Sequence, residues 1–407
     1  MKLEEIVRKS NWDLKKISDV TFYQEGPGVR KKQYTEEGVK LLNVGNIQKG
    51  KIDLSLTDRY ISEEEAYGKY EHFLADEGDL IIACSGIQVS YFHEKIAFLK
   101  KEHLPLCMNT STMRFKSLDK GILDINYFSY FLKTNYFKKQ LQKLITGSAQ
   151  LNFGPSHIEQ IDIMLPPIEI QKQIVEVLDE AQKLIDNRKK QIKLLDDLIE
   201  SIFYDMFGDP VVNDRGWEVK RLGESTEIIT GNTPPRKDVE NYGDYIEWIK
   251  SDNINTPYIY LTEAEEYLSK KGKKIGRYVN KGSILMTCIA GSIDCIGNVA
   301  IANREVAFNQ QINAIIPKKY NLYFLYILFT TTKKYIQNNS TSSMKGMISK
   351  GNLLKLEFII PPIGLQNQFA EKVQAIEKQK ELLEKSLKLM EDNYNSLMQR
   401  AFKGELF

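Results

Sequence analysis

The chain repeats itself, and this repeat constrains the fold more than any other feature of its 407 residues. Trp12-Asp13-Leu14-Lys15-Lys16-Ile17 returns as Trp217-Glu218-Val219-Lys220-Arg221-Leu222, and Leu165-Pro166-Pro167-Ile168 returns as Ile360-Pro361-Pro362-Ile363. The offset between these anchors falls from 205 to 195 residues, which is far longer than the repeat of a solenoid. The sequence therefore predicts a tandem duplication of a whole domain and its tail.

Each half divides at its Pro-Pro pair into a globular part and a tail. Before the pair, short runs rich in Val, Ile and Tyr, such as 79–83 and 284–287, are separated by Gly, Asn and Pro, and helical stretches such as 126–144 and 320–337 lie between them. This mixture indicates an α/β or α+β domain. The predicted parts are a globular domain at 1–167 with a short N-terminal helix, a central helix at 168–210, a second globular domain at 211–362 and a C-terminal helix at 363–407.

The tails have the pattern of a coiled coil. Residues 168–207 contain no Gly or Pro, and nine of ten positions on two seven-residue steps are apolar, with Arg188 as the exception. The second tail keeps this register at an offset of 195, with Lys380 as its charged position. The predicted helix–helix seam consists of Ile174, Leu178, Ile185, Ile192, Leu195, Ile199, Phe369, Val373, Ile376, Leu383, Leu387 and Met390. A lone helix would leave this stripe in water, so each tail needs a partner, either the other tail or its own globular domain.

Helix geometry connects this architecture to a function. Forty helical residues span ~60 Å. If the first helix runs towards the second domain and the second helix returns, the pair is an antiparallel coiled coil with approximate two-fold symmetry and a globular domain at each end. Similar modules on a rigid spacer suit two half-sites on duplex DNA, where one turn is ~34 Å. The two domains differ in sequence, so the half-sites should differ as well.

The net charge of +2 does not indicate a nucleic-acid binder, but the charge is unevenly distributed. Residues 12–167 hold 20 basic and 20 acidic residues, residues 211–361 hold 20 and 15, residues 168–210 hold 6 and 10, and residues 362–407 hold 7 and 7. Basic clusters lie in Gly- or Pro-containing segments that suit phosphate contact, although any one of them is also explained as solvated surface charge. Amides in Gly/Ser/Asn-rich segments can read adenine edges or serve as turn residues and caps. The candidate DNA-binding residues are Arg30, Lys31, Lys32, Gln150, Asn152, Asn232, Thr233, Arg236, Lys237, Lys271, Lys273, Lys274 and Lys345.

Motifs for catalysis are missing from the sequence. It contains no GxGxxG, GxSxG or HExxH, and residues 45–52 resemble a phosphate loop but place Ile52 where a Mg²⁺-binding Ser or Thr is needed. The four Cys form no Cys-x-x-Cys pair and the four His are scattered, so we expect no metal site and a reducing environment. No apolar run approaches the ~20 residues of a membrane span, and the N-terminus has no signal-peptide pattern. These features predict a cytoplasmic protein without catalytic residues or a cofactor of its own.

The ordered, duplicated motifs resemble the specificity subunits of type I restriction–modification systems over essentially the whole chain. In the second half, Thr230-Gly231-Asn232-Thr233-Pro234 is followed by Tyr245-Ile246-Glu247-Trp248-Ile249 and Gly282-Ser283-Ile284-Leu285-Met286. Pro-Pro-Ile-x-x-Gln begins each long helix, although the family has Glu-Gln where this chain has Ile170-Gln171 and Leu365-Gln366.

The resemblance implies two target recognition domains, each reading one half of an asymmetric, bipartite sequence in double-stranded DNA. The helices would set the spacing and dock two modification subunits, which would bind S-adenosylmethionine and methylate adenine. Restriction subunits would add translocation and cleavage that depend on ATP and Mg²⁺, while this chain would catalyse nothing. Two alternatives remain from the residues alone, a duplicated scaffold that does not read DNA and an enzyme with a cryptic site.

Overall fold

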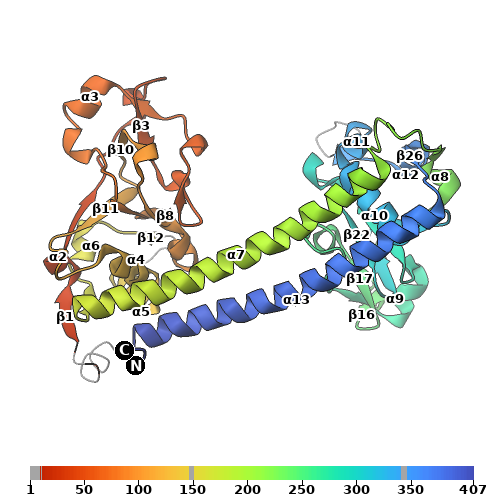
Figure 1. Cartoon of the computed structure of the whole chain (residues 1–407). Helices are drawn as coiled ribbons and strands as arrows, with labels where there is room; N and C mark the ends of the chain where they lie inside the picture. The colour runs from red at the N-terminus through yellow and green to blue at the C-terminus, as the bar shows by residue number, and fades with distance from the viewer. Residues whose placement is uncertain (1–9, 11, 146–150, 341–345) are drawn as a thin grey trace. The chain divides into compact units, whose positions relative to one another are not determined.

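The computed structural model describes residues 10, 12–145, 151–340 and 346–407 (Figure 1). They form two compact units, one of Met1–Asn187 with Leu387–Phe407 and one of Arg188–Ser386. Each unit therefore contains one globular part, the beginning of one long helix and the end of the other.

The first unit is built on a four-stranded antiparallel sheet with the order β2-β11-β7-β9. The strands of the whole first unit, including those outside this sheet, are β1 (Asp13–Lys16), β2 (Thr21–Glu25), β3 (Val39–Leu42), β4 (Ile47–Gln48), β5 (Lys51–Ile52), β6 (Tyr60–Ile61), β7 (Leu80–Ala83), β8 (Ser85–Ile87), β9 (Ile96–Phe98), β10 (Leu106–Met108), β11 (Thr112–Ser117), β12 (Leu151–Asn152) and β13 (Asp162–Leu165). Its short helices are α2 (Ile17–Val20), α3 (Glu63–Tyr67), α4 (Ile125–Lys133), α5 (Asn135–Leu144) and α6 (Pro155–Ile158). Every residue of β7 is buried, as expected for an apolar central strand covered on both faces.

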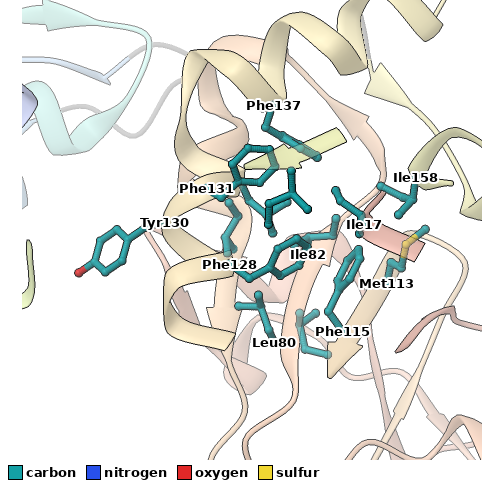
Figure 2. Close-up of a cluster of buried hydrophobic side chains, with 14 of the residues drawn as sticks. Ile17, Leu80, Ile82, Met113, Phe115, Phe128, Tyr130, Phe131, Phe137 and Ile158 are labelled. Atoms are coloured by element: carbon teal, nitrogen blue, oxygen red, sulfur yellow. The ribbon is translucent and has the colours of Figure 1, made fainter. Parts of the chain in front are cut away.

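Figure 2 shows how this sheet is covered. Phe128 of α4 packs on Phe115 of β11 with ring centroids 5.1 Å apart, and Phe131 packs edge-on against Phe137 of α5 at 6.0 Å (Figure 2). The predicted helical stretch at 126–144 is thus two helices, because Thr134 adopts an extended conformation and its side chain accepts a hydrogen bond from the Phe137 backbone N–H. The aromatic residues that recur at helical spacing in this stretch form part of the core.

The second unit repeats this design. Its central sheet has the order β15-β24-β20-β22 and is also antiparallel. Its strands are β14 (Val219–Arg221), β15 (Thr226–Thr230), β16 (Tyr242–Gly243), β17 (Ile246–Ile249), β18 (Tyr267–Leu268), β19 (Tyr278–Val279), β20 (Ser283–Thr287), β21 (Ile289–Ala290), β22 (Val299–Ala302), β23 (Val306–Phe308), β24 (Ile312–Pro317), β25 (Gly346–Met347) and β26 (Glu357–Ile359). Its short helices are α8 (Leu222–Ser225), α9 (Lys270–Ile275), α10 (Leu322–Thr331), α11 (Lys333–Asn338) and α12 (Lys350–Lys355).

The correspondence between the two units extends beyond the central sheets. The first strand of each unit pairs antiparallel with the strand before its Pro-Pro pair, β1 with β13 and β14 with β26. Each unit also has a pair of parallel strands, β3 with β10 and β17 with β23. The predicted duplication of a mixed domain is confirmed at the level of strand order and direction.

The long helices are α7 (Ile168–Phe207) and α13 (Ile363–Ala401), and segments of both meet inside each unit. In the second unit, Phe203 packs on Phe369 with ring centroids 5.6 Å apart, and the Asp196 carboxylate lies 2.6 Å from the Lys380 ammonium. A later residue of α7 thus contacts an earlier residue of α13, and an earlier residue of α7 contacts a later one. The two helices are therefore antiparallel. In the first unit, Ile174 of α7 shares a core with Leu397 of α13.

A glutamine near the start of each long helix anchors that helix to the adjacent domain. Gln171 is fully buried, accepts a hydrogen bond from the Asp124 backbone N–H (2.9 Å), and donates to the carbonyls of Ile122 and Pro166 (both 2.8 Å). Gln366 repeats the arrangement, accepting from the Asn321 backbone N–H at 2.9 Å and donating to the Pro361 carbonyl at 2.7 Å. The glutamine of the Pro-Pro-Ile-x-x-Gln motif thus has a structural role in both halves.

We expect Gln171→Leu to lower the free energy of unfolding of the first unit by about 3 kcal/mol, because it removes three hydrogen bonds and leaves the buried Pro166 carbonyl and the partly buried Asp124 N–H without a partner. Differential scanning calorimetry measures the change. Gln173→Leu is the matched control, since Gln173 is exposed two residues further along the same helix. Equal effects of the two substitutions would contradict the anchoring role.

Candidate nucleic-acid interface

The basic cluster of the first domain is free to contact a ligand. Arg30, Lys31 and Lys32 are exposed and make no ion pair within the described residues. The segment is held by Gln33, whose side-chain oxygen accepts from the Arg30 backbone N–H (3.1 Å) and whose amide donates to Glu65 (2.8 Å). A held backbone with outward cations suits contact with a phosphate chain.

Some of the basic candidates in the second domain form ion pairs within that domain, and others do not. Arg236 lies over the rings of Tyr242 (4.5 Å) and Trp248 (4.9 Å), and its guanidinium is 2.8 Å from the Glu266 carboxylate. It is therefore committed to its own domain by cation–π and ionic contacts.

The lysines of α9 also differ in whether they form ion pairs. Lys271 lies 2.9 Å from Asp238 and 2.7 Å from Glu240, and the hydrogen bond to Asp238 raises its pKa. Lys273 lies 2.5 Å from Glu305, and that hydrogen bond raises its pKa as well. The remaining candidates, Lys237 and Lys274, are exposed and make no ion pair in the part of the chain that the structure describes.

Three polar candidates hold loops together. Asn152 accepts hydrogen bonds from the Ser85 hydroxyl (2.8 Å) and the Gly86 N–H (3.1 Å). Asn232 donates to the Ile275 carbonyl (3.0 Å) and accepts from the Arg277 N–H (2.7 Å). Thr233 donates to the side chain of Gln310. Candidates Gln150 and Lys345 lie outside the described residues.

The predicted seam residues line the inner faces of the long helices to different depths. The buried ones are Ile174, Leu178, Ile185, Ile199, Phe369, Val373 and Ile376, and the half-buried ones are Ile192, Leu195, Leu383, Leu387 and Met390. Two helices alone cannot enclose every apolar position along their length.

The two charged seam positions have different environments. Lys380 is buried, with its ammonium 2.6 Å from Asp196 and 3.8 Å from Glu377. The pattern identified it only as a charged position, because its neutralising partner lies on the other helix. Arg188 is half-buried and its guanidinium donates to Gln191 at 3.0 Å.

Sequence reasoning missed a group of apolar side chains on the outer faces of these helices. The leucines that are exposed there are Leu184, Leu194, Leu198, Leu382 and Leu389. Their signal was available, because they lie beside the heptad positions, but only the structure shows that the seam does not cover them. Leu184 and Leu389 belong to the first unit and the other three to the second, so each unit presents exposed leucines of the kind that another protein covers.

Among the described residues, no group of three or more His, Cys, Asp or Glu side chains is placed to hold a metal ion. Within the same ranges, no helix has both the length and the apolar character that a membrane crossing needs. The four cysteines are free thiols, and Cys84, Cys107 and Cys288 are buried.

Comparison with known proteins bears directly on this architecture. Residues 9–196 and 214–391 each match the family described as the type I restriction modification DNA specificity domain. The chain is 22% identical to a putative type I restriction enzyme MjaX specificity subunit of Methanocaldococcus jannaschii, over 97% of this chain and 94% of that protein. It is also 22% identical to the type I restriction enzyme EcoKI specificity subunit of Escherichia coli, over 97% and 89%.

Solved structures agree with the fold. The S subunit of a type I restriction–modification system from M. genitalium matches with a TM-score of 0.53 at 14% identity, over 97% of this chain and 96% of that one. A chain from a structure of type I R-M complex assembly and conformational transition matches with a TM-score of 0.60 at 16% identity, over 97% and 98%. The family matches cover most of the sequence in two consecutive segments, one for each half of the duplication. The chain therefore belongs to the family of type I restriction–modification DNA specificity proteins.

Proposed function

We propose that the two globular domains, predicted at 1–167 and 211–362, each read one half of a bipartite, asymmetric DNA target. The observation that carries this proposal is the repetition of one sheet order in two units whose surface residues differ. The chain is the recognition subunit of a restriction–modification complex and not its catalytic subunit, as its family indicates. Methylome sequencing of a host that carries this chain with its modification subunit tests the proposal, which requires a split target sequence.

The helices at 168–210 and 363–407 serve in this proposal as the spacer between the domains and as the docking surface for two modification subunits. The exposed leucines of α7 and α13 support this role. Apolar side chains left in contact with water on a helix pair mark a surface that a binding partner covers. S-adenosylmethionine would bind to the modification subunits, and ATP and Mg²⁺ would act on restriction and translocase subunits. Such a complex would work in the cytoplasm, where the DNA is.

The charge distribution supports DNA binding inside a complex. The first domain is neutral overall, the second carries an excess of basic residues, and the segment 168–210 is acidic, with 6 basic and 10 acidic residues. A modification subunit that contacts DNA would contribute the remaining electrostatic attraction. We expect weak DNA binding by the isolated chain and tight binding by the complex, as measured by fluorescence anisotropy at physiological salt.

Replacing Arg30, Lys31 and Lys32 together by Gln is expected to weaken DNA binding by the complex about ten- to hundred-fold and to reduce the salt dependence. The loss should be similar for specific and nonspecific duplexes, because phosphate contacts carry no sequence information. The control replaces three other exposed lysines of the same domain by Gln, Lys49, Lys51 and Lys69. An equal loss in the control would assign the effect to net charge alone.

A duplicated scaffold without DNA reading is the alternative function. Duplex binding by the purified complex that falls steeply with salt and depends on sequence excludes it. Binding that is unaffected by sequence would favour it.

A further inference from the structure

A cleft of about 320 Å³ opens in the second unit between the segment 258–260, helix α10 and one face of α13. Three tyrosines line it, Tyr258, Tyr260 and Tyr323. Helix α13 contributes three carboxylates, Glu377, Glu381 and Glu384, together with Gln374, Lys378 and Lys380. The specificity function assigns no role to this combination of phenol rings and carboxylates.

The tyrosines form a fixed aromatic wall. The hydroxyls of Tyr260 and Tyr323 are hydrogen-bonded to each other at 2.8 Å, which holds both rings in place. Tyr258 is 49% exposed and forms the rim. The faces of phenol rings attract cations, and the attraction is stronger where water is partly excluded.

The carboxylates of α13 are incompletely neutralised by this chain. Glu381 lies 2.7 Å from Lys385. Glu384 has no ion pair or hydrogen bond among the described residues. Glu377 is the most enclosed, with its side chain 18% exposed and its nearest ammonium, Lys380, 3.8 Å away and bonded to Asp196 at 2.6 Å. Burial raises the pKa of Glu377, so its charged form is held at a cost within the free chain.

The fold does not require these groups. At the offset of 195 that relates the two long helices, Glu377 corresponds to Gln182 and Glu384 to Lys189. Glu381 corresponds to Asp186, so the first half builds the same type of helix with only one of the three carboxylates. Glu377 and Glu384 are therefore specific to the second half, and partly enclosed carboxylates that the helix pair does not need indicate binding to something outside the chain.

We propose that this cleft binds an arginine side chain of a modification subunit docked on the long helices, an inference that rests on the proposed function. A guanidinium can stack on a tyrosine face and pair with two carboxylates at once, which a compact ammonium does less well. Phosphate groups of DNA are disfavoured, because the three carboxylates of the cleft outnumber its two lysines and Lys380 is already paired with Asp196. Leu382, 61% exposed, directly follows Glu381, so a partner helix that covers this leucine passes beside the cleft.

The test compares variants of the full chain for binding to the purified modification subunit by isothermal titration calorimetry. Glu377→Gln combined with Glu384→Gln is expected to weaken binding about 30-fold, as for other buried arginine contacts. Glu371→Gln is the control, because Glu371 is an exposed acid on the same helix outside the cleft, and it should change binding less than twofold. Tyr258→Ala should weaken binding about tenfold, whereas Tyr258→Phe, which keeps the ring, should not.

Stability provides a second readout that separates binding from folding. Glu377→Gln removes a buried charge, so the melting temperature of the free chain should stay the same or rise while binding falls. Single arginines of the modification subunit can also be replaced by glutamate. For one of them, the resulting loss of binding should be restored when this chain carries Glu384→Arg. If the parent chain binds the subunit and the cleft variants bind equally well, this inference is overturned and the proposed function stands. If the parent chain does not bind the subunit, the docking role itself fails.

Discussion

Replacing residues 12–167 by the corresponding domain of another specificity subunit is expected to change one half of the methylated sequence completely. The other half and the spacer should stay as they were. The physical reason is that each unit has its own sheet and core, and the central sheets of the two units share no strand. Base contacts that depend on one domain's surface then change without altering the surface of the other.

Among the contacts that the exchange must preserve is an aromatic one. Phe402, which directly follows α13, stacks on Tyr127 of the first domain with ring centroids 5.1 Å apart, and its ring centroid lies 6.3 Å from that of Phe131. A donor domain therefore needs aromatic residues at these two positions to accept the helix. Methylome sequencing reads the result, and the reciprocal replacement of residues 211–361 should change only the other half. A change in both halves after one exchange would show that the domains do not read independently.

The sequence was sufficient to predict the parts of the fold that depend on local pattern. The absence of Gly and Pro between Ile168 and Phe207 predicted a long helix there, because only those residues strongly oppose helix continuation. Helix α7 begins at the predicted residue and ends at Phe207, three residues before the predicted limit of 210. The strand at Leu80–Ala83 followed from its apolar run. The order of strands in each sheet could not be obtained in this way, since pairing joins segments that no local rule connects.

The candidate site was harder to predict, because the availability of a charge depends on its partners in space. Lys271 and Lys274 look alike in the sequence, yet only Lys271 meets Asp238 and Glu240, which come some thirty residues earlier. Similarly, the seven-residue pattern gave no partner for Lys380, because the carboxylate that pairs with it belongs to Asp196, which is 184 residues away in the sequence. Tertiary contacts decide which of several equivalent residues can reach a ligand.

Deleting one heptad from each long helix, residues 188–194 and 383–389, is expected to abolish methylation at the original target and to select one with a shorter spacer. The two segments are related by the offset of 195 residues, so the halves remain equivalent. Seven residues shorten a helix by about 10.5 Å, and at 3.4 Å per base pair this corresponds to about three base pairs. The effect should be large, because three base pairs also rotate one half-site by roughly 100° about the DNA axis relative to the other.

The length of the deletion provides the control. Removing seven residues keeps the seam in phase, so Ile185 and Ile199 still face the partner helix and the chain should fold. Removing four residues from each helix shortens the spacer less but rotates the apolar stripe away from its partner, so this variant should lose stability rather than acquire a new target. Methylome sequencing and calorimetry distinguish the outcomes. An unchanged spacer in a folded seven-residue variant would mean that the helices join the two domains without setting their separation on DNA, and the spacing would then have to be set by the modification subunits.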